Sequence, residues 1–182
     1  MAERPESTTF PYAGRWVALV RGKIVAQGAT REEAFNAARA SRRKEKAEIV
    51  FMLPILGSPL LKSVRDVLPA DQPLFLVGGA VRDSLLGRLT HDLDFAVPTG
   101  ALKLARGIAN RLPAAFFPLD EKNDTARIVI QREDGTRDIL DFAGFRGPDL
   151  ESDLRGRDFT VNALAIDVNT GQAIDPLGGA QD

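Results

Sequence analysis

A length of 182 residues is enough for one ordinary domain and a small additional unit. The composition, 44% hydrophobic and 27% charged, is that of a globular protein, and the absence of cysteine excludes a disulfide scaffold and thiolate metal sites. With His91 as the single histidine, any metal ion would bind oxygen ligands, and a net charge of −1 argues against a protein that coats nucleic acid by bulk electrostatics.

The hydrophobic residues do not form a membrane span. No apolar run approaches the roughly 20 residues that cross a bilayer. The amino terminus lacks the basic and then apolar segments of a signal peptide. We therefore expect a cytoplasmic protein without a membrane partner.

The first 54 residues predict a tail and a small module. Residues 1–11 are polar and show no periodicity, so we expect a flexible tail. Three β-favouring runs follow, at residues 15–20, 23–27 and 48–53. An alanine-rich helix, which Thr30 would cap, separates the second run from the third. The order predicts a ββαβ module over residues 12–54, which resembles a small uncharacterised module of bacterial proteins.

A basic stretch lies between the helix and the third strand of this module. It comprises Arg42, Arg43, Lys44 and Lys46. Charges near a helix end usually form a solvated face, and we prefer that interpretation to the alternative that they guide RNA.

A break in composition predicts the boundary between two units. Pro54, Gly57, Ser58 and Pro59 lie close together, so we place a second domain at residues 55–182. Its pattern alternates strands with helices and then turns into a hairpin. Helices are expected at 60–68, 80–86 and 99–112, and strands at 74–77, 92–97, 115–119, 125–131 and 137–142.

Two glycines follow the first strand of this domain. Gly78 and Gly79 precede a helix that carries Arg82 in its first turn. Paired glycines let the backbone approach a phosphate, and the arginine adds a fork of donors, so the segment is typical of a triphosphate site. The alternative is a tight turn with a surface arginine. A dinucleotide site fits less well, because the third glycine of that fingerprint is absent.

Two acids alternate along the next strand. Asp92 and Asp94 project from one face, while Leu93 and Phe95 point to the other. Two adjacent carboxylates repel each other unless a cation lies between them, and Mg²⁺ prefers such oxygen ligands. The alternative is a solvated strand face.

A third acid is expected from a neighbouring strand. Asp141 lies among apolar residues, where a carboxylate needs a partner; it could complete a metal site and accept the proton of an attacking hydroxyl. Asp138, on the opposite face of that strand, is the competing candidate, and we prefer Asp141.

Several motifs occur in a fixed order between residues 74 and 182. They are GGAVRDSLLG from Gly78, DLD from Asp92, RDFTVNALA from Arg157 and DPLGG from Asp175. Together they resemble the head of the class II tRNA nucleotidyltransferase and bacterial poly(A) polymerase family. The resemblance implies a nucleotidyltransferase fold of the α/β (α+β) class, with a mixed sheet flanked by helices.

The resemblance also implies a role for each matched residue. Asp92, Asp94 and Asp141 would be the catalytic carboxylates that bind Mg²⁺, and Arg157 would contact the incoming nucleotide. The full nucleotide-binding set would be Gly78, Gly79, Arg82, Arg157, Asp158 and Asn162, with Asn162 bonded to the sugar or the backbone.

The chain departs from the family pattern in two respects. Gly156 occupies the position of the first of two arginines, which leaves Arg155 one step earlier and puts one phosphate or RNA contact in doubt. The neck, body and tail that choose between CTP and ATP in the family would lie beyond Asp182. We therefore expect this head not to determine whether CCA, CC, A or poly(A) is added.

The expected function is template-independent transfer of a nucleotide from CTP or ATP to an RNA 3′ end, with tRNA as the expected acceptor. Two Mg²⁺ ions would assist phosphoryl transfer. The alternatives are transfer to a small molecule or a protein, and a non-catalytic fragment that binds NTP or RNA and needs the missing domains. The sequence does not indicate an oligomeric state.

Overall fold

The computed structural model describes residues 12–41, 45–88 and 90–181. The predicted tail at residues 1–11 and the basic residues Arg42, Arg43 and Lys44 lie outside the described residues. The chain divides into two compact units, Met1–Gly57 and Ser58–Asp182. Over the part of the chain that is described, no helix is both long and apolar enough to cross a bilayer.

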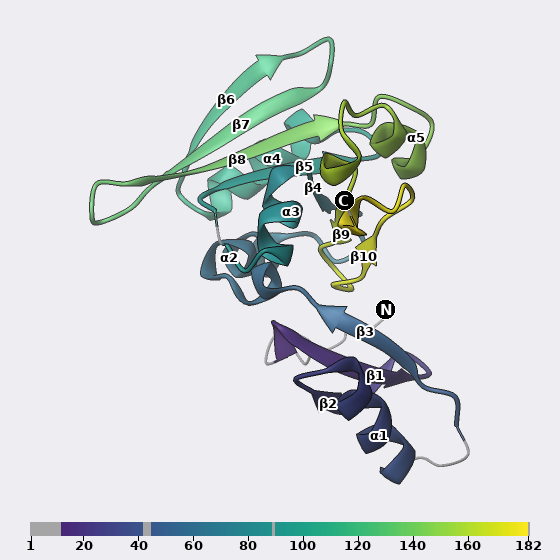
Figure 1. The fold of residues 1–182 in the computed structure, drawn as a ribbon. Coiled ribbons are helices and arrows are strands. Elements are labelled where there is room, and N and C mark those ends of the chain that lie inside the picture. Colours follow the sequence, from purple (N-terminus) through teal and green to yellow (C-terminus); the bar gives the residue numbers. More distant parts are fainter. Residues whose placement is uncertain (1–11, 42–44, 89, 182) are drawn as a thin grey trace. The chain divides into compact units, whose positions relative to one another are not determined.

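The first unit has the predicted ββαβ order (Figure 1). Its elements are β1 (Arg15–Val20), β2 (Lys23–Gly28), α1 (Arg31–Ser41), β3 (Glu48–Met52) and the short 3-10 helix η2 (Pro54–Gly57). β1 is the central strand and is antiparallel to both neighbours. Thr30 Oγ1 accepts a hydrogen bond from the Glu33 N–H at 3.1 Å, and the Glu33 carboxylate accepts one from the Ala29 N–H at 2.8 Å. These bonds satisfy free donors at the start of α1, as the sequence predicts.

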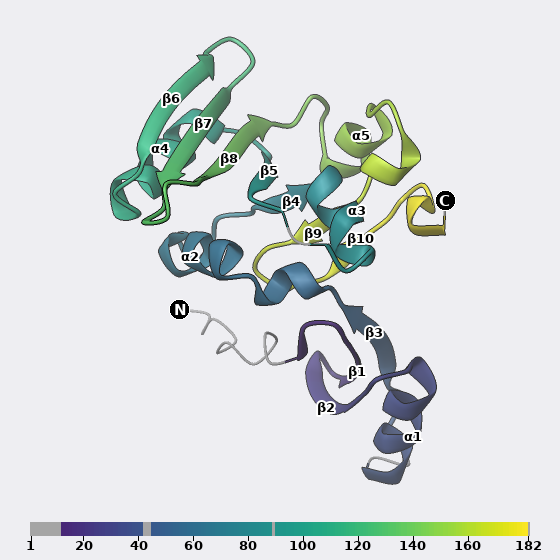
Figure 2. The same cartoon turned by 60° about the vertical axis from the view of Figure 1, so that its left-hand side comes forward.

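The second unit contains a seven-stranded sheet in the order β10-β9-β4-β5-β8-β7-β6 (Figures 1 and 2). Its elements are α2 (Pro59–Val67), β4 (Phe75–Val77), α3 (Gly79–Leu85), β5 (Asp92–Val97), α4 (Ala101–Arg111), β6 (Ala115–Asp120), β7 (Thr125–Gln131), β8 (Arg137–Gly144), α5 (Leu150–Arg155), η3 (Thr160–Asn162), β9 (Ala165–Asp167), β10 (Ala173–Ile174) and η4 (Gly179–Gln181). β5 and β8 are parallel, and the other neighbouring strands of this sheet are antiparallel. The predicted α/β fold with a mixed sheet is confirmed.

One face of the sheet carries the main hydrophobic core. The Phe95 and Phe142 rings stack at 4.9 Å between centres, and these two residues are partners across β5 and β8. Leu93 and Leu140 are buried on the same face, along which α4 packs against β6, β7 and β8. Because side chains alternate along a strand, the acids at positions 92, 94 and 141 project from the other face.

The other face is covered over part of its width. Leu154 of α5 and Ala163, which follows η3, form a second cluster with Val77, Ala96 and Ala165 from three neighbouring strands. Asp92 and Asp94 are exposed beside this cluster. The segment after β8 therefore builds one wall next to the acidic strand.

Candidate active site

The predicted glycine corner connects β4 to α3. Gly78 has φ 73° and ψ −143°, which is a conformation that favours glycine. A Cβ at this position would lie 3.4 Å from Arg157 Nη1 and 3.6 Å from Asp94 Oδ2. The Gly78 N–H already donates to the Leu164 carbonyl at 3.2 Å. Gly78 thus brings the backbone close to an acid and an arginine, whereas its own N–H is occupied within the protein.

Asp94 and Asp141 are brought together by the only parallel pair of strands among those described. They are direct partners in the β5–β8 register, and Asp92 precedes Asp94 by two residues on the same face. The side chains alternate with buried Leu93 and Phe95, so packing on the helix-covered face holds the carboxylates on the opposite face.

The surroundings of Asp94 raise its pKa. Its side chain is exposed on one side, yet the loss of hydration caused by the protein packed around it is the largest cause, followed by repulsion from Asp141. Arg157 lowers the pKa, Asp92 raises it further and Arg127 opposes that rise. A carboxylate in this position is stabilised by any cation that approaches it.

Asp141 has an arginine partner that the sequence analysis did not predict. Arg127 Nε donates to Asp141 Oδ1 and Arg127 Nη2 donates to Oδ2, both at 2.7 Å. Arg127 is the direct partner of Asp141 across β7 and β8, and this pair raises the pKa of the guanidinium. The acid is therefore neutralised by the protein itself.

The competing candidate, Asp138, has a structural role. It is buried on the helix-covered face, where it accepts a hydrogen bond from Arg132 Nε at 2.6 Å and contacts His91 Nδ1 at 2.9 Å. It lies on the opposite face of β8 from Asp141. Asp138 thus does not project toward Asp92 and Asp94.

Two arginines lie near the glycine corner, and each is held by another side chain. Arg82 Nη1 donates to Asn162 Oδ1 at 2.9 Å, and Arg82 Nη2 would lie 3.4 Å from a Cβ at Gly79. Arg157 Nη2 donates to Asp153 Oδ2 at 3.2 Å. The matched motifs from distant parts of the sequence therefore meet at one place.

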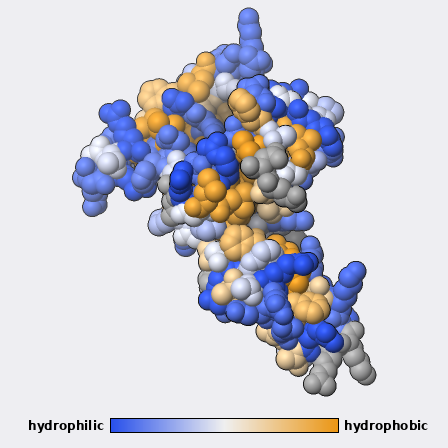
Figure 3. All heavy atoms as spheres, viewed as in Figure 1, coloured by the Kyte–Doolittle hydropathy of each residue, from blue (hydrophilic) through white to orange (hydrophobic). Residues whose placement is uncertain are grey.

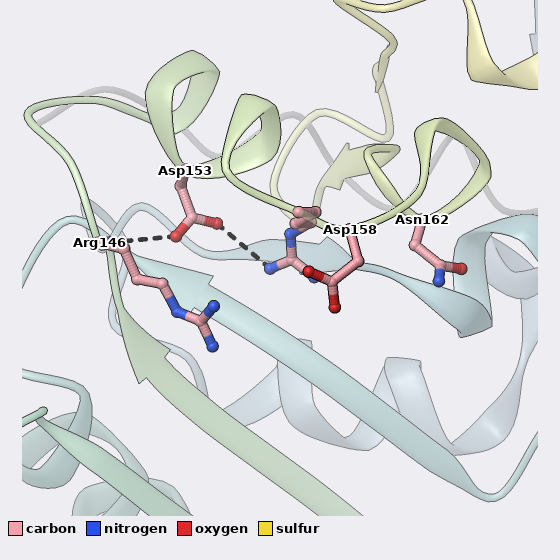
Figure 4. Close-up of a pocket in the computed structure, with 5 residues that line it drawn as sticks. Arg146, Asp153, Asp158 and Asn162 are labelled. Atoms are coloured by element: carbon pink, nitrogen blue, oxygen red, sulfur yellow. Dashed lines mark hydrogen bonds and ion pairs between the residues drawn. The ribbon is translucent and has the colours of Figure 1, made fainter.

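A polar cavity of about 200 Å³ adjoins these residues. It is lined by Arg146, Asp153, Arg157, Asp158 and Asn162 (Figure 4). Figure 4 shows Asp153 between the backbone of Arg146 and a guanidinium. The cavity combines two arginines and an amide with two aspartates, one of which, Asp153, accepts hydrogen bonds from Arg157 and from the Arg146 backbone.

Three residues of this arrangement were missed by sequence reasoning. Arg146 comes five residues after Asp141, and no pattern in the sequence marked it as part of the site. Asp153 lies four residues before Arg157, but this spacing alone did not indicate an ion pair. Its burial, with 6% of the side chain exposed, identifies it as the partner of Arg157. Arg127 could have been found only from the register of the β7–β8 hairpin.

The carboxylates do not form a ready metal cage. Within residues 12–41, 45–88 and 90–181, no group of three or more His, Cys, Asp or Glu side chains lies close enough together to hold a metal ion. Asp92 and Asp94 offer the hard oxygen ligands that Mg²⁺ requires, and the pKa of Asp94 is raised first by loss of hydration and then by repulsion from Asp141. Asp141 would have to turn away from Arg127 to join them.

Comparison with known proteins assigns both parts of the chain. Residues 74–182 match the family described as Poly A polymerase head domain, and residues 11–54 match a family of unknown function (DUF5678). The CC-adding tRNA nucleotidyltransferase of Geobacter sulfurreducens is 44% identical over 108 residues, which are 59% of this chain and 24% of that protein. The A-adding tRNA nucleotidyltransferase of Deinococcus radiodurans is 45% identical over 107 residues, which are 59% of this chain and 23% of that protein.

A solved structure agrees with these relatives. The complex of a CCA-adding enzyme with CTP has a TM-score of 0.59 and 34% identity, covering 69% of this chain and 32% of that one. The chain spans about a quarter of the length of the two curated relatives named above. Since the match extends over more than half of its residues and includes the glycine corner and all three acids, the chain belongs to the Poly A polymerase head domain family.

Proposed function

We propose that this chain is the catalytic head of a template-independent RNA nucleotidyltransferase. It transfers a nucleotide from CTP or ATP to the 3′ end of an RNA, in tRNA CCA addition or poly(A) addition. The observation that carries the proposal is the pairing of Asp94 with Asp141 on parallel strands beside Gly78 and Arg157. In this geometry the acidic side chains would lie at the phosphate that reacts. The basic side chains would lie at the phosphates that leave.

The triphosphate side of the site consists of fixed donors. Arg157 is oriented by Asp153 and Arg82 by Asn162, so both guanidinium groups are held before a ligand arrives. Arg146 lies across the cavity and adds a third positive charge. Preorganised donors of this kind stabilise the charge that develops on pyrophosphate as it leaves. Asp158 and Asn162 line the same cavity, where the sugar is the group that suits them.

The acidic side of the site fits a divalent cation. Asp92 and Asp94 would hold Mg²⁺, with Asp141 as a third ligand once it is released from Arg127. When bound, Mg²⁺ neutralises phosphate charge and increases the acidity of an attacking hydroxyl; we expect two ions, as in other phosphoryl-transfer sites.

The reaction is a displacement at the α-phosphorus of the NTP. The RNA 3′ oxygen forms a bond to that phosphorus while the bond to the bridging oxygen of pyrophosphate breaks. The proton of the 3′ hydroxyl passes to Asp141 or to water, and the arginines hold the pyrophosphate. The protein positions the reactants and stabilises charge, and it forms no covalent bond with them.

The head is not expected to choose the base. The chain is 44% identical to a CC-adding relative and 45% identical to an A-adding relative, so it resembles both classes equally. If this unit determined the product, similarity to one class would be greater. We therefore propose that selection between CTP and ATP depends on parts of the enzyme other than this head.

The test is incorporation of labelled CTP and ATP by the 182-residue chain into tRNA transcripts that end before CCA or after CC. We expect Mg²⁺-dependent incorporation that Asp94→Asn abolishes. The matched control is Asp71→Asn, at an exposed aspartate outside the site, which should retain activity.

The alternative function is a non-catalytic NTP- or RNA-binding unit. The ion pair between Arg127 and Asp141 favours it, because this pair leaves one acid engaged. Mg²⁺-dependent NTP binding without transfer to any of these transcripts would support the alternative and contradict catalysis by this chain.

A further inference from the structure

Two large apolar side chains are exposed on the outer strand of the hairpin. Phe117 and Leu119 of β6 are 49% and 53% exposed. Phe117 is paired with Arg127 of β7, and Leu119, at the shift in register between Pro118 and Asp120, extends the exposed apolar surface next to it. Phe116, which precedes Phe117, points to the opposite face, where the Arg106 guanidinium of α4 lies 4.2 Å from its ring centre. One side of β6 is thus packed against a helix and the other is open.

The open side of β6 continues the row that contains the catalytic candidates. Asp94 pairs with Asp141, Asp141 with Arg127, and Arg127 with Phe117, across four neighbouring strands. Residues paired in this way project from one face of the sheet. With strands about 4.8 Å apart, Phe117 lies about 10 Å from Asp141 along the row. Figure 3 shows hydrophobic residues over β6 and β7 among hydrophilic ones.

The hairpin is held in place by a contact outside the row. Asp124, in the turn between β6 and β7, accepts hydrogen bonds from the N–H groups of Ala101 and Leu102 at 2.8 and 2.9 Å. These bonds cap α4, whose own N-cap residue is Gly100 and has no side chain to do so. The strand that carries Phe117 is therefore attached to the core helix.

We propose that Phe117 and Leu119 form a stacking platform for a base near the 3′ end of the acceptor RNA, with Arg127 contacting the phosphate that follows this base. The inference rests on the proposed function, since it takes RNA as the acceptor. An aromatic ring and an arginine next to each other are the elements with which proteins hold single-stranded RNA without reading its sequence. The pair with Asp141 uses Arg127 Nε and one hydrogen of Nη2, so other N–H groups of a side chain that is 41% exposed are left for a phosphate.

The size and chemistry of this surface favour a nucleic-acid base over a second protein. Two apolar side chains match one base, whereas a stable protein interface buries about 800 Å² on each partner. Strand addition by another chain is disfavoured, because Pro118 interrupts this edge strand and the register with β7 shifts between Pro118 and Asp120. The row leads directly to the acids where the 3′ hydroxyl must react.

The experiment measures binding of the 182-residue chain to a fluorescein-labelled tRNA transcript that ends before CCA, by fluorescence anisotropy at fixed salt. Phe117→Ala is expected to raise Kd about tenfold, which lies in the range of one lost base stack. Phe117→Trp should stay within about twofold of the wild type, and Leu119→Ala should lose about twofold. The matched control is Phe35→Ala, which removes a phenylalanine of the first unit that is 43% exposed.

A second readout reports stacking directly. A 2-aminopurine placed near the RNA 3′ end should be quenched by the wild type and by Phe117→Trp, and much less by Phe117→Ala. Arg127→Gln should reduce the slope of log affinity against log salt by about 0.7, as expected for one lost phosphate contact on a single strand.

Several results would overturn the proposal. One is a Phe117→Ala variant that is folded, as judged by native circular dichroism, and has unchanged Kd and unchanged quenching. Another is self-association of the wild type that only this variant abolishes. If Phe117→Ala does not fold, Phe117→Leu keeps the apolar volume without a ring and must still weaken quenching. Asp94→Asn separates the proposed function from the stacking platform. We expect this variant to lose nucleotide transfer and to keep the quenching of 2-aminopurine. Transfer that persists would contradict the proposed function but not the platform.

Discussion

Asp94 and Asp141 are direct partners on parallel strands, but their charges are compensated differently. Asp141 has a bidentate ion pair with Arg127 at 2.7 Å, whereas Asp94 depends on the electrostatic effect of Arg157 and has a raised pKa. Asp141 is thus paired directly, whereas the ionised form of Asp94 is disfavoured by loss of hydration and by repulsion from Asp141. A cation or a neutral side chain at this position should act on stability as well as on catalysis.

Asp94→Asn should remove activity and slightly stabilise the fold. A folded-state pKa that is raised means that the ionised form of Asp94 is less favourable in the folded protein than in the unfolded chain. At neutral pH the substitution should increase the free energy of unfolding by at most about 1 kcal/mol, because the side chain is solvent-exposed. Urea unfolding of wild type and variant at pH 7 measures the difference. A clear loss of stability would contradict this account of the charge.

The gain from Asp94→Asn should depend on pH in a defined direction. For an acid with a raised folded-state pKa, the unfavourable contribution is fully present above that folded pKa and disappears as the pH falls below the ordinary value of 3.8. The difference between variant and wild type should therefore shrink on acidification. Parallel unfolding curves at several pH values check the sign, and a difference that grows toward acid pH would exclude it.

Mg²⁺ should stabilise the wild-type chain through the same carboxylates. A ligand that binds only the folded state at ten times its Kd adds about 1.4 kcal/mol to the free energy of unfolding. Thermal melts with and without Mg²⁺ should show an increase in Tm that EDTA reverses. Asp94→Asn should reduce the increase, and Asp71→Asn should leave it intact. An equal Mg²⁺ effect in all three proteins would place the ion elsewhere.

The sequence predicted the order of helices and strands and the shared face of Asp92 and Asp94, because both depend on local patterns. Alternation along β5 places Asp92 and Asp94 on one face whatever the neighbouring strands are, and the two glycines at 78 and 79 require a turn. Asp141 could be placed near them because its own strand was predicted to be a neighbour.

The missed features depend on contacts between distant residues. β9 and β10 have three and two residues, too few for a period. β9 forms a strand because it pairs with β4, and β10 because it pairs with β9. The partnership of Arg127 with Asp141 follows from the register of a hairpin, and the burial of Asp153 follows from the packing of α5. Such facts arise from tertiary structure, which no window of the sequence contains.

Asp153 should control the nucleotide site through Arg157. Its buried carboxylate accepts hydrogen bonds from Arg157 Nη2 and from the Arg146 backbone N–H, at 3.2 and 3.1 Å. Asp153→Ala leaves a half-buried guanidinium without its acid and should lower the free energy of unfolding by about 3 kcal/mol. Asp153→Asn keeps one oxygen acceptor and should cost less.

The same pair of variants separates folding from binding. Fluorescence titration with an ATP analogue should show weaker binding for Asp153→Asn at a temperature where it is fully folded. The matched control is Glu151→Gln on the same helix, which loses an exposed ion pair with Arg155 and should behave like the wild type. Wild-type nucleotide affinity in Asp153→Asn would mean that Arg157 is positioned without its acid.

Gly78→Ala should damage the site more than its backbone strain alone explains. A non-glycine residue at φ 73° and ψ −143° costs about 1–3 kcal/mol. The new Cβ would also lie 3.4 Å from Arg157 Nη1 and 3.6 Å from Asp94 Oδ2, within the space where a phosphate is proposed to bind. The chain supplies a matched control in Gly87, which has φ 71° and open space around its Cβ position. Gly87→Ala carries a left-handed φ penalty without the contacts.

Comparison of the two variants isolates the contribution of the site. Both should lose stability in urea unfolding, whereas only Gly78→Ala should weaken nucleotide binding, by about tenfold or more, because only its methyl group lies between the acid and the arginine. Titration with an ATP analogue below the unfolding transition measures this difference. Equal losses of affinity in the two variants would show that global destabilisation is the cause, and the glycine corner would then have no direct part in holding the triphosphate.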